Sequence, residues 1–348
     1  MPHPEPSVSF DPTDPYSRTA QIFPTLTEEQ IERICPFGEV VSLPQGTVLF
    51  ERGERRVDFF VVLQGYIEIY QHTGKGLQVI TEHREQQFTG ELDLFNDREI
   101  LVGGRMGADG RVIRLNRGQF RKLIAAEPDI SDIIMRAFML RRMGLISHHQ
   151  GSVTIVAQHH SGDTLRLERF LGRNGYPLEV LDYESEHSQR CLINTRVSPD
   201  DLPVVLIPDR DEVLRNPSNL ALARALGLVE PLRTDHTYDV TIIGAGPAGL
   251  SATVYAASEG LSTVLLEAEA PGGQAGTSSK IENYLGFPLG ISGQGLAGRA
   301  QVQAHKFGAT IALPYRVESL DCDTSPYQIQ LGEQGLRTRT IIITTGAR

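Results

Sequence analysis

The first patterned stretch of the chain, from residue 38 to about residue 115, alternates short apolar runs with glycines. Apolar runs of this length, bounded by glycine turns, are typical of β-strands, and their regular spacing predicts an antiparallel barrel or double-sheet roll. Between Phe120 and Phe138 the apolar positions recur at helical spacing, which predicts a pair of helices closing this domain. The predicted strands are residues 40–43, 47–50, 58–63, 66–70 and 77–83.

The pattern changes twice more along the chain. After Gly151, strands alternate with helices over about 80 residues, which predicts a small α/β domain. From Tyr238, a buried-type strand runs into a glycine-rich turn and a helix, the usual beginning of a doubly wound, Rossmann-like sheet. The fold class is therefore multidomain. The expected boundaries are a disordered tail at 1–25, a β-roll at 26–150, the small α/β domain at 151–229, a linker at 230–237 and the third domain at 238–348.

Composition and charge narrow the class of protein. The 348 residues include 33 Lys and Arg against 43 Asp and Glu, a net charge of −10, whereas a nucleic-acid binder should carry a basic patch. No apolar run reaches about 18 residues, so no membrane-spanning helix is predicted, and the polar N-terminus does not resemble a signal peptide. Cys35, Cys191 and Cys322 form neither a CxxC pair nor a disulfide framework, which favours a reducing cytoplasm.

The clearest chemistry lies at the start of the third domain. A glycine after the strand allows a tight turn, a second lets a pyrophosphate approach the backbone, and a third lets the helix pack close to the strand. The helix then presents free N–H groups and a positive dipole end to the phosphates. A second strand, 263–266, ends at Glu267, where a carboxylate binds ribose hydroxyls and disfavours a 2′-phosphate. This predicts FAD or NAD rather than NADP. The motif is Gly244-Ala245-Gly246-Pro247-Ala248-Gly249.

Three further motifs resemble the low-molecular-weight thioredoxin reductase family of flavoproteins: 272–274 (GGQ), 281–288 (IENYLGFP) and 344–347 (TTGA). By that resemblance the cofactor is FAD. Gly273 and Gln274 line the flavin, Asn283 contacts it, Gly346 closes over it, and Val317 lies near the adenine. The alternative reading, in which Gln274 and Asn283 only satisfy loop backbone groups, stays open.

The chain departs from that family at its end. In that family, the segment that corresponds to the residues around Gly346 leads into an inserted NADPH domain, and the chain then returns to finish the FAD domain. This sequence stops at Arg348. No CxxC pair and no returning FAD segment are found among these residues. The sequence is therefore expected to be the N-terminal part of a longer flavoprotein, with an incomplete FAD domain, and NAD(P)H use is expected only of the full-length protein.

The first block resembles the cyclic-nucleotide-binding domain of catabolite activators and cyclic-nucleotide-dependent kinases. The resemblance rests on spaced glycines, Phe59 and a cassette at 88–95 (FTGELDLF). It implies that Gly90 and Glu91 hold the ribose and that an Arg about nine to eleven residues later pairs with the cyclic phosphate. Ile100, Leu101 and Val102 occupy those positions, with Arg98 and Arg105 on either side. The roll is thus predicted to bind a cyclic nucleotide, with Arg98 as the candidate cation, or another small molecule, or to be purely structural.

The middle block resembles a thioredoxin or glutaredoxin fold. The support is a strand at 153–157, a helix from Thr164, and Leu202-Pro203-Val204, where that family places a cis-proline before an edge strand. Residues 159–164 (HHSGDT) occupy the place of the redox pair, so thiol exchange is excluded there, and Ser161 or Asp163 is predicted to cap the helix. Histidine pairs at 148–149 and 159–160 are interpreted as loop residues, so no metal ligand is predicted.

The order of the three blocks resembles a bacterial group of predicted cyclic-nucleotide-binding thioredoxin reductase homologues. This resemblance implies a flavin-dependent oxidoreductase that passes electrons from NAD(P)H through FAD to an unidentified acceptor. The expected partners are a redox protein and a second copy of this chain. No catalytic acid or base is evident. The alternative hypothesis is a non-catalytic, ligand-sensing module with a vestigial FAD region.

Overall fold

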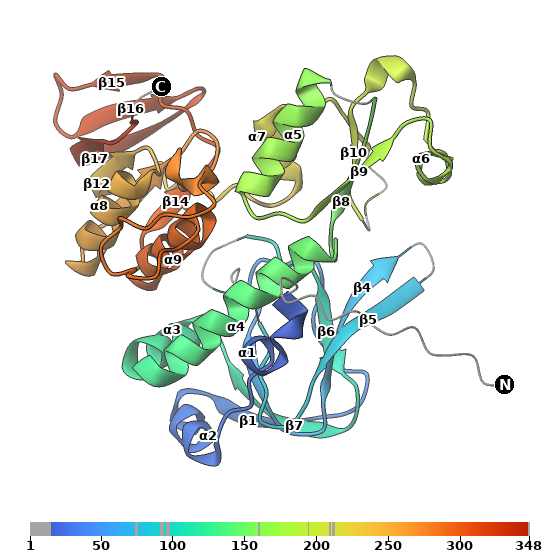
Figure 1. Ribbon diagram of the computed structural model, residues 1–348. Helices are drawn as coiled ribbons and strands as arrows, with labels where there is room; N and C mark the ends of the chain where they lie inside the picture. The colour runs from blue at the N-terminus through green and yellow to red at the C-terminus, as the bar shows by residue number, and fades with distance from the viewer. Residues whose placement is uncertain are drawn as a thin grey trace.

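The computed structural model describes residues 15–73, 76–90, 94, 98–158, 161–193, 195–208, 210 and 213–346. Figure 1 shows three bodies that follow one another along the chain, coloured blue to teal, green to yellow, and orange to red. They correspond to the roll, the middle domain and the third domain. Within these residues, no helix is both long and apolar enough to cross a lipid bilayer.

The first body is a roll of two antiparallel sheets, as the strand spacing predicted. One sheet has the order β1-β7-β3 and the other the order β2-β6-β4-β5. The five strands predicted from the sequence all form, with ends displaced by up to three residues. The strands are β1 Glu39–Leu43, β2 Val48–Phe50, β3 Phe59–Gln64, β4 Ile67–Thr73, β5 Gly76–His83, β6 Gly103–Met106 and β7 Gly110–Leu115.

Helices close one end of the roll around an aromatic core. Phe59 of β3 packs against Phe88, Phe120 and Phe138, and all four side chains are fully buried. Phe120 and Phe138 lie on the inner faces of α3 and α4, and their burial explains the helical spacing of apolar positions in this part of the sequence. The helices are α2 Glu28–Ile34, α3 Arg117–Ala126 and α4 Pro128–Ser147.

The N-terminal segment differs from the expectation of disorder up to residue 25. Residues 15–25 form η1 Pro15–Ser17 and the short helix α1 Thr19–Ile22, and Ile22 is fully buried. Arg141 of α4 donates from Nε to the carbonyl oxygen of Ile22 over 2.9 Å. The order of this segment therefore comes from a contact 119 residues away in sequence, which its own polar composition does not reveal.

The middle domain is a four-stranded sheet of order β11-β10-β8-β9, in which β8 and β9 are parallel and the other pairs antiparallel. Ser161 caps α5 by accepting from the Thr164 N–H, which confirms the predicted cap. The Leu202–Pro203 bond is cis, but the strand after it, β10, is internal, since β11 forms the edge. Assignment to the thioredoxin fold stays a prediction. The elements are β8 Val153–Ala157, α5 Gly162–Arg173, β9 Leu178–Asp182, α6 Glu186–Cys191, η4 Pro199–Asp201, β10 Val204–Leu206, β11 Val213–Arg215 and α7 Asn219–Ala225.

The third domain is a six-stranded sheet of order β14-β13-β12-β17-β16-β15. The first four strands are parallel, as predicted for a doubly wound sheet, and β16 and β15 add an antiparallel arm. Helices α8 and α9 lie on one face, where a core of small and branched side chains packs between helices and sheet. The elements are β12 Thr237–Ile243, α8 Pro247–Ser258, β13 Thr263–Leu266, η5 Ala275–Thr277, α9 Gly293–Lys306, β14 Thr310–Ala312, β15 Ser319–Asp321, β16 Tyr327–Leu331 and β17 Gln334–Ile343.

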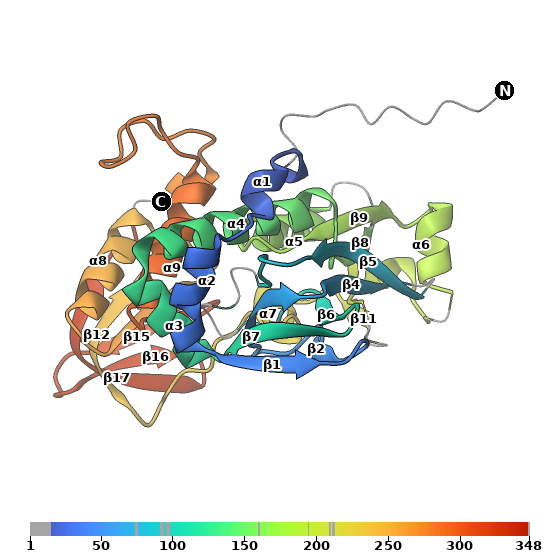
Figure 2. The same ribbon diagram turned by 90° about the horizontal axis from the view of Figure 1, so that it is seen from below.

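The roll and the middle domain share one hydrophobic core. A continuous cluster of buried side chains joins Phe50 and Leu101 of the roll to Ile155 and Leu171 of the middle domain. At its rim the carboxylate of Glu99 pairs with Arg210 of the middle domain over 2.7 Å. The third domain has two cores of its own and meets the roll through α9, which lies beside α3 and α4 in Figure 2.

Candidate functional site

The turn after β12 brings the helix of the third domain against the strands. Gly244 has a φ of +101°, which L side chains rarely adopt, and α8 starts three residues later with Pro247 in its first turn. A Cβ on Gly249 would lie 1.9 Å from the Gly244 carbonyl oxygen and 2.6 Å from Oγ1 of Thr344. Only a glycine at 249 therefore lets α8 pack this close to β12 and β17.

Gly246 stands at the open side of the same turn. A Cβ added there would meet no heavy atom within 4 Å, so the space in front of the helix N-terminus is free. The first N–H groups of a helix have no partner within the helix, and they favour negative charge. The turn and helix therefore fit the pyrophosphate of a dinucleotide, and Ala245 and Ala248 bring no bulk to it.

Glu267 follows β13 directly and reaches back to the turn. Its carboxylate accepts from the backbone N–H of Ala245 over 2.8 Å and from that of Glu269 over 2.9 Å. Two backbone donors hold the carboxylate at the carboxyl edge of the sheet, where Rossmann-type folds bind a ribose. The carboxylate, as an acceptor for hydroxyl groups, thus fits the adenosine ribose of FAD or NAD.

The second glycine motif lies against the first. The N–H of Gly272 donates to the carbonyl oxygen of Ala245 over 2.7 Å, and a Cβ on Gly273 would lie 3.0 Å from Cα of Gly246. Thr344, just past β17, donates from its backbone N–H to Ile243. Gly246, Glu267, Gly273 and the segment before Gly346 therefore meet at one edge of the sheet, although they span about 100 residues of sequence.

Three predicted flavin residues lie farther out. Gln274 and Asn283 are exposed, and Asn283 belongs to a loop closed by a bridge between Ile281 and Ile291, which stands away from the sheet in Figure 2. Val317 is half-buried in the coil between β14 and β15 and packs on the second core of the domain. Contact of these three residues with a flavin stays a prediction.

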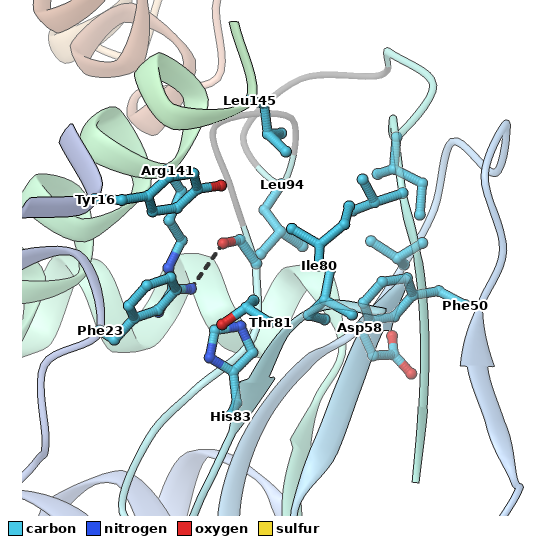
Figure 3. A pocket seen from close by; sticks show the side chains of 15 residues that line it. Tyr16, Phe23, Phe50, Asp58, Ile80, Thr81, His83, Leu94, Arg141 and Leu145 are labelled. Atoms are coloured by element: carbon cyan, nitrogen blue, oxygen red, sulfur yellow. Dashed lines mark hydrogen bonds between the residues drawn. The ribbon is translucent and has the colours of Figure 1, made fainter. Parts of the chain in front are cut away.

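A second cavity lies inside the roll (Figure 3). It measures about 640 Å³ when the open space at its mouth is counted, and Gly90 and Leu94 of the predicted cassette line it. The side chains around it are mostly hydrocarbon, with His83 and Arg141 at one end. Arg141 donates from Nη1 to the Gly90 carbonyl oxygen over 2.9 Å and lies over the ring of Phe88. Glu91, the other predicted ribose ligand, lies outside the described residues.

The two arginines near the predicted phosphate position have other contacts. Arg98 donates from Nη1 to the carbonyl oxygen of Asn174 in the middle domain over 3.4 Å. Arg105 pairs with Glu68 over 2.7 Å and lies over the ring of Tyr70. Neither is among the described side chains that line the cavity. The pairing of Arg98 with a phosphate therefore stays a prediction.

Comparison with known proteins assigns two of the three domains. Residues 40–127 match the family model described as cyclic nucleotide-binding domain, and residues 238–348 match that described as pyridine nucleotide-disulphide oxidoreductase. The chain combines these two domains. The second match contains every residue of the dinucleotide turn, and the first contains Gly90, Glu91 and Arg98.

The oxidoreductase domain is similar to thioredoxin reductases. It is 42% identical over 113 residues to NADPH-dependent thioredoxin reductase 3 of Arabidopsis thaliana, covering 31% of this chain and 21% of that protein. It is 40% identical over 111 residues to thioredoxin reductase of Bacillus subtilis, covering 32% and 34%. The chain therefore matches between about a fifth and a third of the length of these relatives.

Two solved structures are each similar to about a third of the chain. Thioredoxin reductase of Streptococcus pyogenes is 36% identical, with a TM-score of 0.31, over 32% of this chain and 36% of its own. The catabolite activator protein of Thermus thermophilus is 19% identical, with a TM-score of 0.31, over 35% and 58%.

Other chemistry has little support in the described residues. Among them, no three His, Cys, Asp or Glu side chains converge as a metal site, and all three cysteines are free.

The cyclic nucleotide-binding domain holds a buried histidine, His83, whose Nδ1 has no hydrogen-bond partner among the described residues. Burial, and then the charge of Arg141, hold the pKa of His83 well below its ordinary range. The sequence alone did not mark His83 or Arg141 as candidate site residues, because neither belongs to a motif.

A second buried histidine lies where the oxidoreductase domain meets the roll. His305 of α9 is 7% exposed, and its Nδ1 is 3.2 Å from the carbonyl oxygen of Ala309, so Nδ1 carries the donated hydrogen. Burial, and then the charge of Arg98 with smaller contributions from Arg121 and Arg117, lower the pKa of His305 to about 3. The side chain is therefore neutral in the folded protein.

His305 is expected to make the fold sensitive to acid. The unfolded chain protonates His305 below pH 6.5, whereas the folded chain does so only near pH 3, so the unfolded state binds more protons in this window. Stability should fall by roughly 1.4 kcal/mol for each pH unit below 6.5. His305→Asn, which keeps a donor for Ala309, should flatten the dependence of the melting temperature on pH between 4 and 7. The same change at exposed His187 should leave that dependence as in the wild type, and equal slopes in both variants would refute the assignment.

Proposed function

We propose that the chain is the FAD-binding and sensor part of a flavin-dependent NAD(P)H oxidoreductase. One observation supports this most strongly: the turn at Gly244–Gly249, the carboxylate of Glu267 and the Gly272–Gly273 segment meet at the carboxyl edge of a parallel sheet. The similarity to thioredoxin reductases favours FAD over NAD at this site. The proposal also covers the use of NAD(P)H, the identity of the electron acceptor and the activity of the whole protein.

The residues of the chain would bind and orient the cofactor. The free N–H groups of α8 would hold the pyrophosphate, and the carboxylate of Glu267 would exchange its bond to the Ala245 N–H for the ribose hydroxyls. Gly273 would leave room for the ribityl chain beside Gly246. Bound FAD supplies two-electron chemistry between a nicotinamide and an acceptor. No side chain here is assigned as an acid or base.

The partners are part of the same proposal. The match to the cyclic nucleotide-binding family supports a cyclic nucleotide in the roll, with Gly90 at the cavity wall. Thioredoxin-type proteins are the natural class of redox partner, although the chain carries no CxxC pair to pass electrons through a dithiol. A homodimer and a cytoplasmic location are the corresponding expectations.

A second candidate function is a non-catalytic sensor. It is favoured by the mostly apolar cavity of the roll, which shares no lining residue with the dinucleotide turn. In this reading the third domain is a scaffold that binds no flavin.

FAD titration of the purified chain separates the two functions. The oxidoreductase proposal predicts saturable quenching of FAD fluorescence at one FAD per chain, competed by ADP because the ADP half meets the turn and Glu267. The sensor reading predicts no quenching, together with measurable heat on titration with cAMP or cGMP. A folded chain that binds no FAD at any concentration tested would overturn the proposed function.

A further inference from the structure

The C-terminal end of α5 in the middle domain touches the segment 269–273 of the proposed flavin site. The guanidinium of Arg173 pairs with the carboxylate of Glu269 over 2.9 Å. Its Nη2 also donates to the carbonyl oxygen of Gly273 over 3.1 Å and to that of Ala270 over 3.4 Å. One side chain of the middle domain thus holds three acceptors on a single loop of the third domain.

The neighbouring residue strengthens this contact. Asn174, the C-cap of α5, is 7% exposed and donates from Nδ2 to the carbonyl oxygen of Glu269 over 3.1 Å. Gln294 of α9 donates back to the carbonyl oxygen of Gly172 over 3.1 Å. Because Arg98 of the roll donates to the carbonyl oxygen of Asn174, all three domains meet at this corner.

The loop held by Arg173 is part of the dinucleotide site. Gly272 is bonded to Ala245 of the turn, and Gly273 lies against Gly246, so a shift of this segment changes the space in front of the helix N-terminus. Gly273 has a φ of +54°, and a glycine in the left-handed region is free to adopt other conformations unless a neighbour fixes it. The planar fork of an arginine is suited to fixing a carboxylate and backbone carbonyls together.

The middle domain has no sulfur at the position where thioredoxin-like domains carry their redox pair, since residues 157–164 read AQHHSGDT. A thiol reaction at α5 therefore does not account for its presence. The C-terminal end of α5, by contrast, makes several hydrogen bonds with segment 269–273.

We propose that the middle domain serves as a support for the flavin site, and that Arg173 is the positioning residue that holds segment 269–273 in its binding conformation. This inference rests on the proposed function for its effect on FAD, but not for its effect on the loop itself. Arg173 acts through Gly273 and Glu269 and is not expected to touch the reacting atoms.

The test compares Arg173→Ala and Arg173→Lys with Arg169→Ala. Arg169 lies one turn earlier on α5 and lines the same pocket as Arg173, Glu269 and Ala270, but it makes no hydrogen bond or ion pair within the described residues. Arg169→Ala therefore removes an equal charge beside the segment and leaves the contacts of Arg173 in place. Two measurements are made on the intact chain. The first is amide hydrogen exchange of segment 269–276 without FAD, and the second is FAD affinity together with the visible absorption spectrum of the bound flavin.

Arg173→Ala should speed exchange at the Gly272 amide and weaken FAD binding about tenfold, the loss expected for charge-assisted hydrogen bonds. Arg173→Lys should recover part of both effects, because an ammonium keeps the pair with Glu269 but cannot span the two carbonyls. Arg169→Ala should match the wild type. Equal exchange and affinity in Arg173→Ala and Arg169→Ala would overturn the inference, whereas a wild type without FAD binding would overturn only the proposed function, since the exchange measurement still tests the loop.

Discussion

Gly246→Ala is expected to weaken FAD binding strongly while the third domain stays folded. The backbone of Gly246 has φ −69° and ψ 179°, a conformation that alanine adopts without strain, and the new methyl group would meet no atom of the protein within 4 Å. The same methyl group would occupy the space that a pyrophosphate needs in front of α8. We expect a loss of about 100-fold in FAD affinity, or ~2.7 kcal/mol, with an unchanged melting temperature.

Two other glycines are matched controls for this experiment. Gly298 lies inside α9, and a methyl group added there would meet no heavy atom within 4 Å apart from the backbone of its own helix. Gly298→Ala should therefore bind FAD normally and gain roughly 0.5 to 1 kcal/mol in stability. Gly249→Ala should instead damage the fold, because its Cβ would lie 1.9 Å from the Gly244 carbonyl oxygen. Normal FAD affinity in Gly246→Ala would show that the pyrophosphate does not lie over this turn.

The part of this site that was predictable from sequence is the part built from neighbours in the chain. The strand, the turn at Gly244 and the helix are consecutive, and Glu267 follows at the end of the next strand, so spacing alone places the carboxylate beside the turn. The contact of Gly273 with Gly246 depends on how a loop folds back. The contact of Arg173 with that loop depends on the packing of two domains, which no local pattern records.

The same distinction holds for the folds. The strands of the roll and the first strands of the third domain were predictable because each carries its own apolar pattern. The apolar pattern marks strand β17 less clearly, although it lies next to β12 at the centre of the sheet, because polar and charged residues interrupt it before residue 341. Residues 15–25 look like a polar tail until the contact of Ile22 with Arg141 is known.

Leu167→Ala in the middle domain is expected to destabilise the roll as well. Leu167 is fully buried on α5 and belongs to the hydrophobic core that continues into the roll. Truncating a buried leucine to alanine costs about 2 to 5 kcal/mol, because the hydrocarbon contacts are lost and a cavity remains. Since the roll and middle domain share that core, the loss should weaken both, whereas the third domain, with cores of its own, should be unaffected.

Hydrogen exchange by segment measures this directly, because a chain of several domains has no single free energy of unfolding. Amides of β4 in the roll and β8 in the middle domain should exchange faster together in Leu167→Ala, and those of β12 and β13 should not change. Leu165→Ala is the control, since the same residue type two positions earlier on α5 is 49% exposed and should alter none of them. Faster exchange in β8 alone would show that the two domains open independently. Joint exchange would mean that a ligand stabilising the roll also stabilises α5, and with it the support that Arg173 gives to the flavin segment.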